Sequence, residues 1–166
     1  QQMKRKPWIL VSGSLVMHQI APTEILPRQG QTVLGTGFCK APGGKGANQA
    51  VQAARLGAEV TMFGKLGCDA NGEEMYRACS QAGICMDFVA RDPRESSGCA
   101  VVLLEEKPGE SARNRIIVIP GANMSITREE AAFLEKTIKE YDLLLLQLEL
   151  SMEINTYLAQ LAHRNG

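Results

Sequence analysis

The apolar positions of this chain alternate between short continuous runs and stretches of helical period, which predicts strands that alternate with helices. The strands are expected at 8–13, 59–63, 84–89 and 143–149. The helices are expected at 46–56, 71–82 and 128–140, followed by a last helix that Ser151 caps. This order is typical of an α/β fold in which helices cover an open, parallel sheet.

Three further segments break this rhythm. Residues 98–104 and 114–119 are apolar and β-branched, and the polar stretch between them predicts a hairpin. Residues 31–41 also look extended. We interpret the three segments as an antiparallel excursion from the main sheet. At the start of the predicted helix 128–140, Thr127 and Glu130 have the spacing of a capping box.

Composition and charge narrow the class of protein. The chain has 166 residues, of which 45% are hydrophobic and 22% charged, as in an ordinary globular domain with its own core. The 18 basic and 18 acidic residues cancel, so charge gives no reason to expect nucleic acid or a membrane as a partner. The apolar run at 8–11 is too short for a signal peptide, and we expect a cytoplasmic protein.

The five cysteines and two histidines do not have the spacing of a metal site. The sequence contains no C-x-x-C pair, and His18 and His163 lie far apart in the chain. The odd number of cysteines also argues against a disulfide framework. We therefore predict free thiols and no metal ligands.

The strongest chemical signal is the glycine-rich turn Gly43-Gly44-Lys45-Gly46, which leads into the helix predicted at 46–56. Such a turn lets backbone N–H groups approach a polar ligand, and the helix N-terminus adds a positive partial charge. Lys45 and Asn48 are placed to face the same ligand. A simple tight turn with a helix cap would explain the glycines, but it would require neither the lysine nor the asparagine.

Two other glycine-rich motifs lack residues that they require in this sequence. A Walker A loop needs a hydroxyl after its lysine and a leading glycine, but Gly46 and Cys39 occupy these positions. A dinucleotide fingerprint needs a third glycine where the chain has Gln49. A nucleotide-binding Rossmann module is therefore disfavoured.

The turn resembles the first signature of the ribokinase-like carbohydrate kinases. The spacing of that signature is met by Gly43, Gly44, Gly46, Asn48, Ala50, Gly57 and Gly67. Collinear matches cover the rest of the chain, at Gly13-Ser14, Gly30-Gln31-Thr32-Val33, Gly67-Cys68-Asp69, Ser97-Gly98, Gly121-Ala122-Asn123 and Gln147-Leu148-Glu149.

The resemblance implies a kinase that transfers the γ-phosphoryl group of ATP to a sugar hydroxyl, with Mg²⁺ and, as a further candidate, a monovalent cation. It implies that segments 31–41, 98–104 and 114–119 form a small β-sheet lid, through which two copies of the full-length protein pair as a homodimer. The implied sugar-binding residues are Gly44, Lys45, Gly46, Ala47, Asn48 and Glu149. Glu149 could instead cap the helix that follows it.

The chain departs from the family pattern after Gly13-Ser14. The family has Asn and Asp side chains that bind sugar hydroxyls where this chain has Val16 and His18. Valine accepts no hydrogen bond, whereas histidine can donate or accept one. His18 is therefore a candidate ligand for a different sugar, or a strand-end histidine with a local hydrogen bond, and the identity of the sugar stays open.

The second departure concerns length. Members of the family are about twice as long, and their catalytic Asp lies in a Gly-Ala-Gly-Asp turn that is absent from these 166 residues. Residues 1–166 are thus expected to be the N-terminal half of the domain, with no catalytic residue, and with ATP and Mg²⁺ bound by the other half. The alternative is a sugar-binding pseudokinase or a truncated product without catalysis. Asp69 fits a helix cap better than a catalytic base.

Overall fold

The computed structural model describes residues 5–166 and contains two four-stranded sheets. The main sheet is parallel, in the order β5-β4-β1-β8, with β1 at Trp8–Ser12, β4 at Glu59–Gly67, β5 at Cys85–Asp92 and β8 at Leu143–Leu146. Its inner strands β1 and β4 are largely buried. The prediction of an open, parallel, helix-covered sheet is therefore confirmed.

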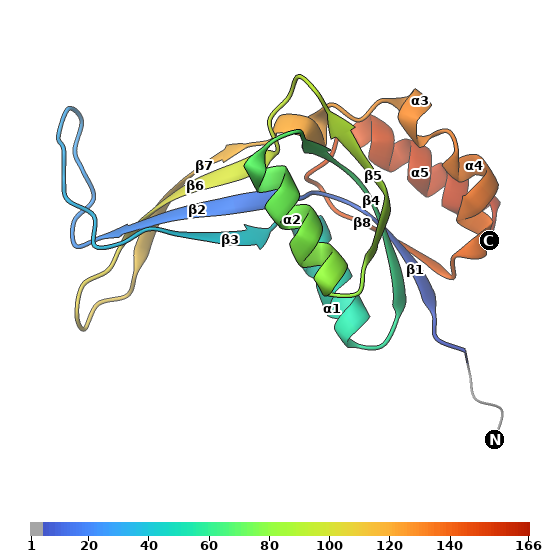
Figure 1. The fold of residues 1–166 in the computed structure, drawn as a ribbon, viewed down its shortest axis with the longest axis horizontal. Helices are drawn as coiled ribbons and strands as arrows, with labels where there is room; N and C mark the ends of the chain where they lie inside the picture. The colour runs from blue at the N-terminus through green and yellow to red at the C-terminus, as the bar shows by residue number, and fades with distance from the viewer. Residues whose placement is uncertain (1–4) are drawn as a thin grey trace.

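Helices cover both faces of the main sheet (Figure 1). One face packs against α1 (Lys45–Arg55) and α2 (Ala70–Gln81). The other packs against α5 (Met152–Arg164) and the short helices α3 (Arg128–Ala131), α4 (Leu134–Thr137) and the 3₁₀ turn η2 (Ile138–Glu140). Within the part of the chain described, no helix combines the length and apolarity that a membrane crossing needs.

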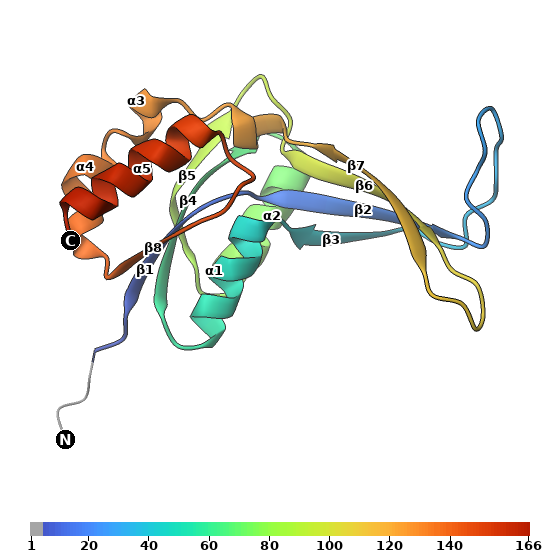
Figure 2. The ribbon, with the colours of Figure 1, turned by 180° about the vertical axis from the view of Figure 1, so that it is seen from behind.

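The second sheet projects away from the helices (Figure 2). Its order is β3-β2-β6-β7, with β2 at Val16–Thr23, β3 at Cys39–Gly43, β6 at Gly98–Glu105 and β7 at Arg113–Ile119. β2 and β6 run parallel, and the two outer pairs are antiparallel. The predicted hairpin is present as β6 and β7. The 3₁₀ turn η1 (Gly121–Met124) then leads the chain back to the main sheet.

The small sheet differs in part from the prediction. Of the segment expected at 31–41, only Cys39–Ala41 lies in a strand, and residues 31–38 belong to a long loop between β2 and β3. Pro27, Gly30, Gly35 and Gly37 favour turns there rather than a strand. The strand that was missed is β2, whose histidine, glutamine and proline hide its alternation.

The helix predicted at 128–140 is also divided. Its start is as predicted, because the Glu130 N–H donates to Thr127 Oγ1 and the Thr127 N–H donates to Glu130 Oε2, both at 3.2 Å. The chain then forms three short turns, α3, α4 and η2, in place of one helix. The apolar residues that recur at helical spacing in this stretch are nevertheless buried, namely Ala131, Leu134 and Ile138.

Candidate functional site

The glycine-rich turn lies where the small sheet passes into the main one. Gly44 is the N-cap of α1 and has φ +97°, a conformation that other residues rarely adopt. A Cβ at Gly44 would lie 2.7 Å from the Ser14 carbonyl oxygen, and one at Gly46 would lie 2.6 Å from Gly13 Cα. Both glycines are therefore needed so that the start of α1 can pack directly on the chain leaving β1.

Glu149 follows β8 and reaches this turn across the sheet edge. Its Oε1 accepts a hydrogen bond of 2.8 Å from the Lys45 backbone N–H and one of 2.9 Å from the Ser14 hydroxyl. Its Oε2 lies 3.8 Å from Lys45 Nζ. Residues 104 positions apart thus meet at the carboxyl edge of a parallel sheet, as the order of the elements predicts.

These contacts alter the expectation for the backbone of the turn. The Lys45 N–H is bound by Glu149, the Gly46 N–H donates to Ser14 Oγ at 3.3 Å, and the Ala47 N–H donates to the Ser14 carbonyl at 3.0 Å. The first donors of α1, which we predicted would face a ligand, are thus used within the chain. A ligand would instead meet the exposed side chains of Lys45 and Asn48.

His18 lies beside the same turn. A Cβ at Gly43 would lie 2.9 Å from His18 Cδ2, so the imidazole of β2 packs over the residue that opens the turn. The side chain of His18 is half-buried. Val16 is buried in a small cluster with Ala100 and Val102, where it offers no polar group. Of the two departures from the family pattern, only His18 combines a polar side chain with partial exposure.

Comparison with known proteins identifies the family to which this arrangement belongs. Residues 6–166 match the model of the pfkB family of carbohydrate kinases. The chain belongs to this family. Among its curated relatives, a ribokinase of Bacillus subtilis is 40% identical over 145 residues, and a deoxyribokinase of Salmonella typhimurium is 32% identical over 158 residues. These alignments cover 87% and 95% of this chain, and 48% and 50% of the relatives.

Comparison of the fold with solved structures identifies the same family. The structure of an Arabidopsis thaliana ribokinase complexed with ribose and ATP superposes with a TM-score of 0.84 at 30% identity. The superposition covers 98% of this chain and 52% of the other. The chain therefore spans about half the length of the pfkB relatives that it matches.

Ser14, which connects the parts of this candidate site, was not singled out from the sequence. Its hydroxyl donates to Glu149 and accepts from Gly46, so it joins the end of β1 to both parts of the site. The signal available in the sequence was the match at Gly13-Ser14, which was assigned no role. Glu149, for its part, does not cap α5, because Ser151 Oγ accepts the Ile154 N–H there.

Asp69 is a structural residue of α2. Its carboxylate accepts the Gly72 N–H at 2.8 Å, and it accepts both the N–H and the hydroxyl of Ser97. Burial acts to raise the pKa of Asp69, but these hydrogen bonds outweigh it and hold the pKa below its ordinary value. A carboxylate stabilised in its charged form in this way is a weak base, which agrees with the helix cap predicted from the sequence.

Proposed function

We propose that this chain is the sugar-binding half of an ATP-dependent carbohydrate kinase of the ribokinase type. The observation that carries the proposal is the meeting of Glu149, Lys45 and Ser14 at the start of α1, in a chain of the pfkB family. A carboxylate and an ammonium group side by side, in a partly exposed position, are suited to the hydroxyl groups of a sugar.

Each proposed ligand has a distinct part. Lys45 Nζ and the Asn48 amide supply donors, and Glu149 Oε2 supplies an acceptor, since Glu149 Oε1 is already taken by two donors of the chain. His18 would contact the sugar from the small sheet. The roles of Gly44, Gly46 and Ala47 are to shape the turn and bring the helix start close, rather than to donate hydrogen bonds.

Within 5–166, no three or more His, Cys, Asp or Glu side chains gather in a way that could hold an ion by themselves. Mg²⁺ in such enzymes is usually held by one or two carboxylates together with the phosphates of the nucleotide. We assign ATP and Mg²⁺, together with the base that deprotonates the sugar, to the part of the relatives that this chain does not match. Phosphoryl transfer depends on positioning and charge neutralisation, so a sugar site alone is not sufficient for it.

The test is ATP turnover with ribose, deoxyribose and fructose, comparing the 166 residues with a protein extended to the full length of the relatives. We expect turnover only in the extended protein. Turnover by the 166 residues would contradict the assignment of ATP to the other half. If neither protein turns over ATP but ribose still binds, the chain belongs to a sugar-binding pseudokinase.

The pseudokinase alternative can be tested at Val16 and His18, of which Val16 is buried among apolar side chains. The variants Val16→Asn and His18→Asp, made singly and together in the extended protein, test it directly. Gain of turnover in the double variant would show that these two positions had removed the activity. If turnover is already present, the same variants should instead change which sugar is preferred.

We further propose that the small sheet is the lid of the sugar site and the surface through which two copies pair. Ile117, Ile119 and Val101 lie on one face of it and are 66%, 36% and 37% exposed. An apolar patch of this kind on a projecting sheet is typical of an interface. In sedimentation experiments, Ile117→Lys should convert a dimer of the extended protein into a monomer, while Leu56→Lys, at an exposed leucine outside the small sheet, should not.

A further inference from the structure

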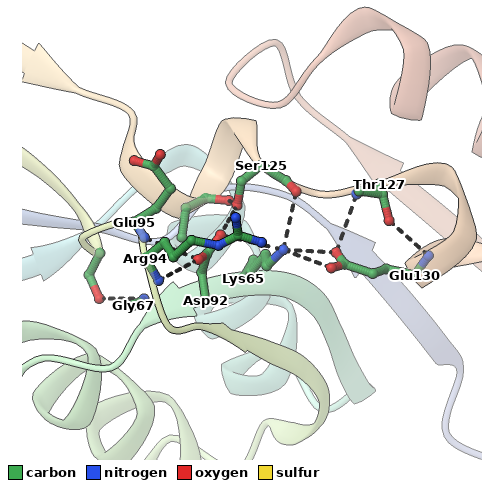
Figure 3. Close-up of polar contacts among 10 residues, drawn as sticks. Lys65, Gly67, Asp92, Arg94, Glu95, Ser125, Thr127 and Glu130 are labelled. Atoms are coloured by element: carbon green, nitrogen blue, oxygen red, sulfur yellow. Dashed lines mark hydrogen bonds and ion pairs between the residues drawn. The ribbon is translucent and has the colours of Figure 1, made fainter.

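The two sheets meet at a polar joint that is remote in sequence from the glycine-rich turn. We use the name "sheet joint" for Lys65, Asp92, Asn123, Ser125 and Glu130. Lys65 comes from β4, Asp92 ends β5, Asn123 is in η1, and the other two residues lie just after it and in α3. Figure 3 shows the part of the joint around Lys65 and Ser125.

Asn123 connects the joint to the small sheet. Its Oδ1 accepts the Leu15 N–H and its Nδ2 donates to the Leu15 carbonyl, both at 2.9 Å, and Nδ2 also donates to the Pro120 carbonyl at 2.9 Å. Leu15 immediately precedes β2, and Pro120 immediately follows β7. One buried amide therefore fixes the point where β2 leaves the main sheet and the point where β7 returns to it.

Lys65 holds the segment that carries Asn123. Its ammonium group donates to the Ser125 carbonyl at 3.1 Å and to the two carboxylate oxygens of Glu130 at 2.8 and 3.0 Å (Figure 3). The Asp92 carboxylate lies 3.6 Å away. Lys65 is only 5% exposed, so its charge depends on these partners rather than on water.

Asp92 completes the joint from the other side. It accepts the Ser125 hydroxyl at 2.6 Å and the backbone N–H groups of Arg94 and Glu95 at 2.8 and 3.0 Å. The stretch 93–97 that these bonds order is the connection from β5 into β6 of the small sheet. Three of the chain's passages between the sheets, at Leu15, at 93–97 and at Pro120, are therefore held by one network.

We propose that Lys65 is a positioning residue for the sugar site: through Ser125 and Asn123 it sets where β2, and with it His18, lies relative to Lys45 and Glu149. The inference rests on the proposed function for the sugar site, but the joint itself does not. Lys65 touches none of the proposed sugar ligands in the contacts described, and it acts on them through the segment 120–126, with Asp92 and Glu130 as its other partners.

The chemistry of the joint supports a role in orientation over a role in stability alone. Burying a lysine with its carboxylates carries a large desolvation penalty, and apolar side chains of similar size often stabilise a fold equally well. Hydrogen bonds with fixed directions, in contrast, define one arrangement of the elements that they connect. A joint of this kind is suited to holding a projecting sheet that has little core of its own.

The first test uses the 166-residue chain and hydrogen exchange measured by mass spectrometry. In Lys65→Met, peptides from β2, β6 and 120–126 should exchange roughly tenfold faster or more, which corresponds to about 1.4 kcal/mol of local opening. Peptides from α1, α2 and β1 should stay as in the unmodified chain. Lys6→Met, which removes the exposed ion pair between Lys6 and Glu59, is the matched control and should change neither group.

Two outcomes would overturn the inference. Unchanged exchange in β2 and β6 would show that Lys65 does not hold the small sheet, and an equal rise in every peptide would show a general contribution to stability. If Lys65→Met does not fold, Glu130→Gln serves in its place. It removes one charge next to Lys65 but keeps an acceptor for the capping box, and the same division between the two groups of peptides is expected.

The second test is titration with ribose, followed by NMR, on the same variants. Lys65→Met should weaken ribose binding by roughly tenfold, again about 1.4 kcal/mol, and Lys65→Arg should recover part of the affinity. Unaltered affinity together with faster exchange in β2 would overturn the positioning role. Absence of ribose binding in the unmodified chain would instead count against the proposed function, and the exchange experiment would still decide whether Lys65 holds the joint.

Discussion

The two sheets have the same number of strands but differ in how many buried apolar side chains stabilise each of them. The main sheet lies between two clusters of twelve and eleven buried apolar residues, whereas the cluster belonging to the small sheet has three. Both faces of β7 are open, with Ile117 and Val118, which point to opposite sides, 66% and 54% exposed. The same kinds of β-branched residue are thus buried in one region and exposed in the other.

This difference shows that the small sheet depends on what lies around it. The base of β2 is anchored through Leu15 and Met17 in the main core, but the outer part of the sheet has only its ladder of hydrogen bonds and a thin apolar layer. A sheet with one or both faces in water needs another surface to bury its apolar side chains. The comparison can be tested by changing each region separately.

The largest effect is expected from a cavity in the main sheet. Leu10→Ala, at a fully buried position, should reduce the free energy of unfolding by about 2–5 kcal/mol. Ile117→Ala, on the small sheet, should change it by about 0.5 kcal/mol or less. Urea unfolding at equilibrium measures both, and a similar loss in the two variants would show that the sheets do not differ in this way.

The glycine-rich turn should be nearly as sensitive as the core. Gly46→Ala places a Cβ against the backbone of Gly13 and Ser14, and this overpacking should cost about 1–3 kcal/mol. Gly83→Ala has open space around it but a φ of +87°, so it should cost about 1 kcal/mol. Thermal and urea unfolding of the two variants compare them. Equal stability of Gly46→Ala and the unmodified chain would remove the argument for close packing at the turn.

The sheet joint predicts an acid-sensitive contribution. The Ser125 hydroxyl, the N–H groups of Arg94 and Glu95 and the charge of Lys65 hold the pKa of Asp92 well below its ordinary value of 3.8. A lowered pKa means that the stabilisation is complete above the unfolded-state pKa and is lost as the pH falls toward the folded-state pKa. The stability difference between the unmodified chain and Asp92→Asn should therefore be constant above about pH 5 and shrink below about pH 4.

The measurement is the urea midpoint of both proteins as a function of pH. Asp87→Asn, at an exposed aspartate, is the matched control. A difference between the unmodified chain and Asp92→Asn that stays constant into strong acid would contradict the role given to the Asp92 carboxylate.

The smallest effect on stability is expected at the open edge of the main sheet. Among the described residues 5–166, β8 pairs with β1 alone, and Leu143 at its start is 51% exposed. Leu143→Lys should alter the free energy of unfolding by about 0.5 kcal/mol or less, yet it should reduce self-association, because a charge on an edge strand opposes pairing with another chain. Light scattering against concentration compares the variant with the unmodified chain, and unchanged scattering would show that association occurs elsewhere.

The sequence predicted the main sheet well because each of its parts has a local signature. Apolar runs marked the strands, while Ser151 and the pair Thr127 and Glu130 marked helix starts with known geometry. In the helix predicted at 46–56, Ala47, Ala50, Val51 and Ala54 recur at helical spacing, and these side chains pack on the sheet. Local capping signals and apolar periodicity were therefore sufficient to predict most elements of the main sheet and its helices.

What the sequence could not show depends on contacts between distant residues. β2 has no clear alternation and becomes a strand because β3 and β6 pair with it on both sides. Ser14 gains its place in the site from Glu149, which lies 135 positions away. The use of the α1 N–H groups within the chain also arises from these two residues, and a local glycine motif gives no indication of it.

The parallel pairing of β2 with β6 bears on the order in which this protein folds. Val16 lies opposite Gly98, so β2 cannot gain its central partner until more than 80 further residues are available. The hairpin of β6 and β7 and the unit from β4 to β5 have much shorter loops to close, and loop closure that spans more residues costs more entropy. The small sheet is therefore expected to form late. During synthesis, the edge of β2 that pairs with β6 stays unpaired while the helix-covered main sheet begins to form.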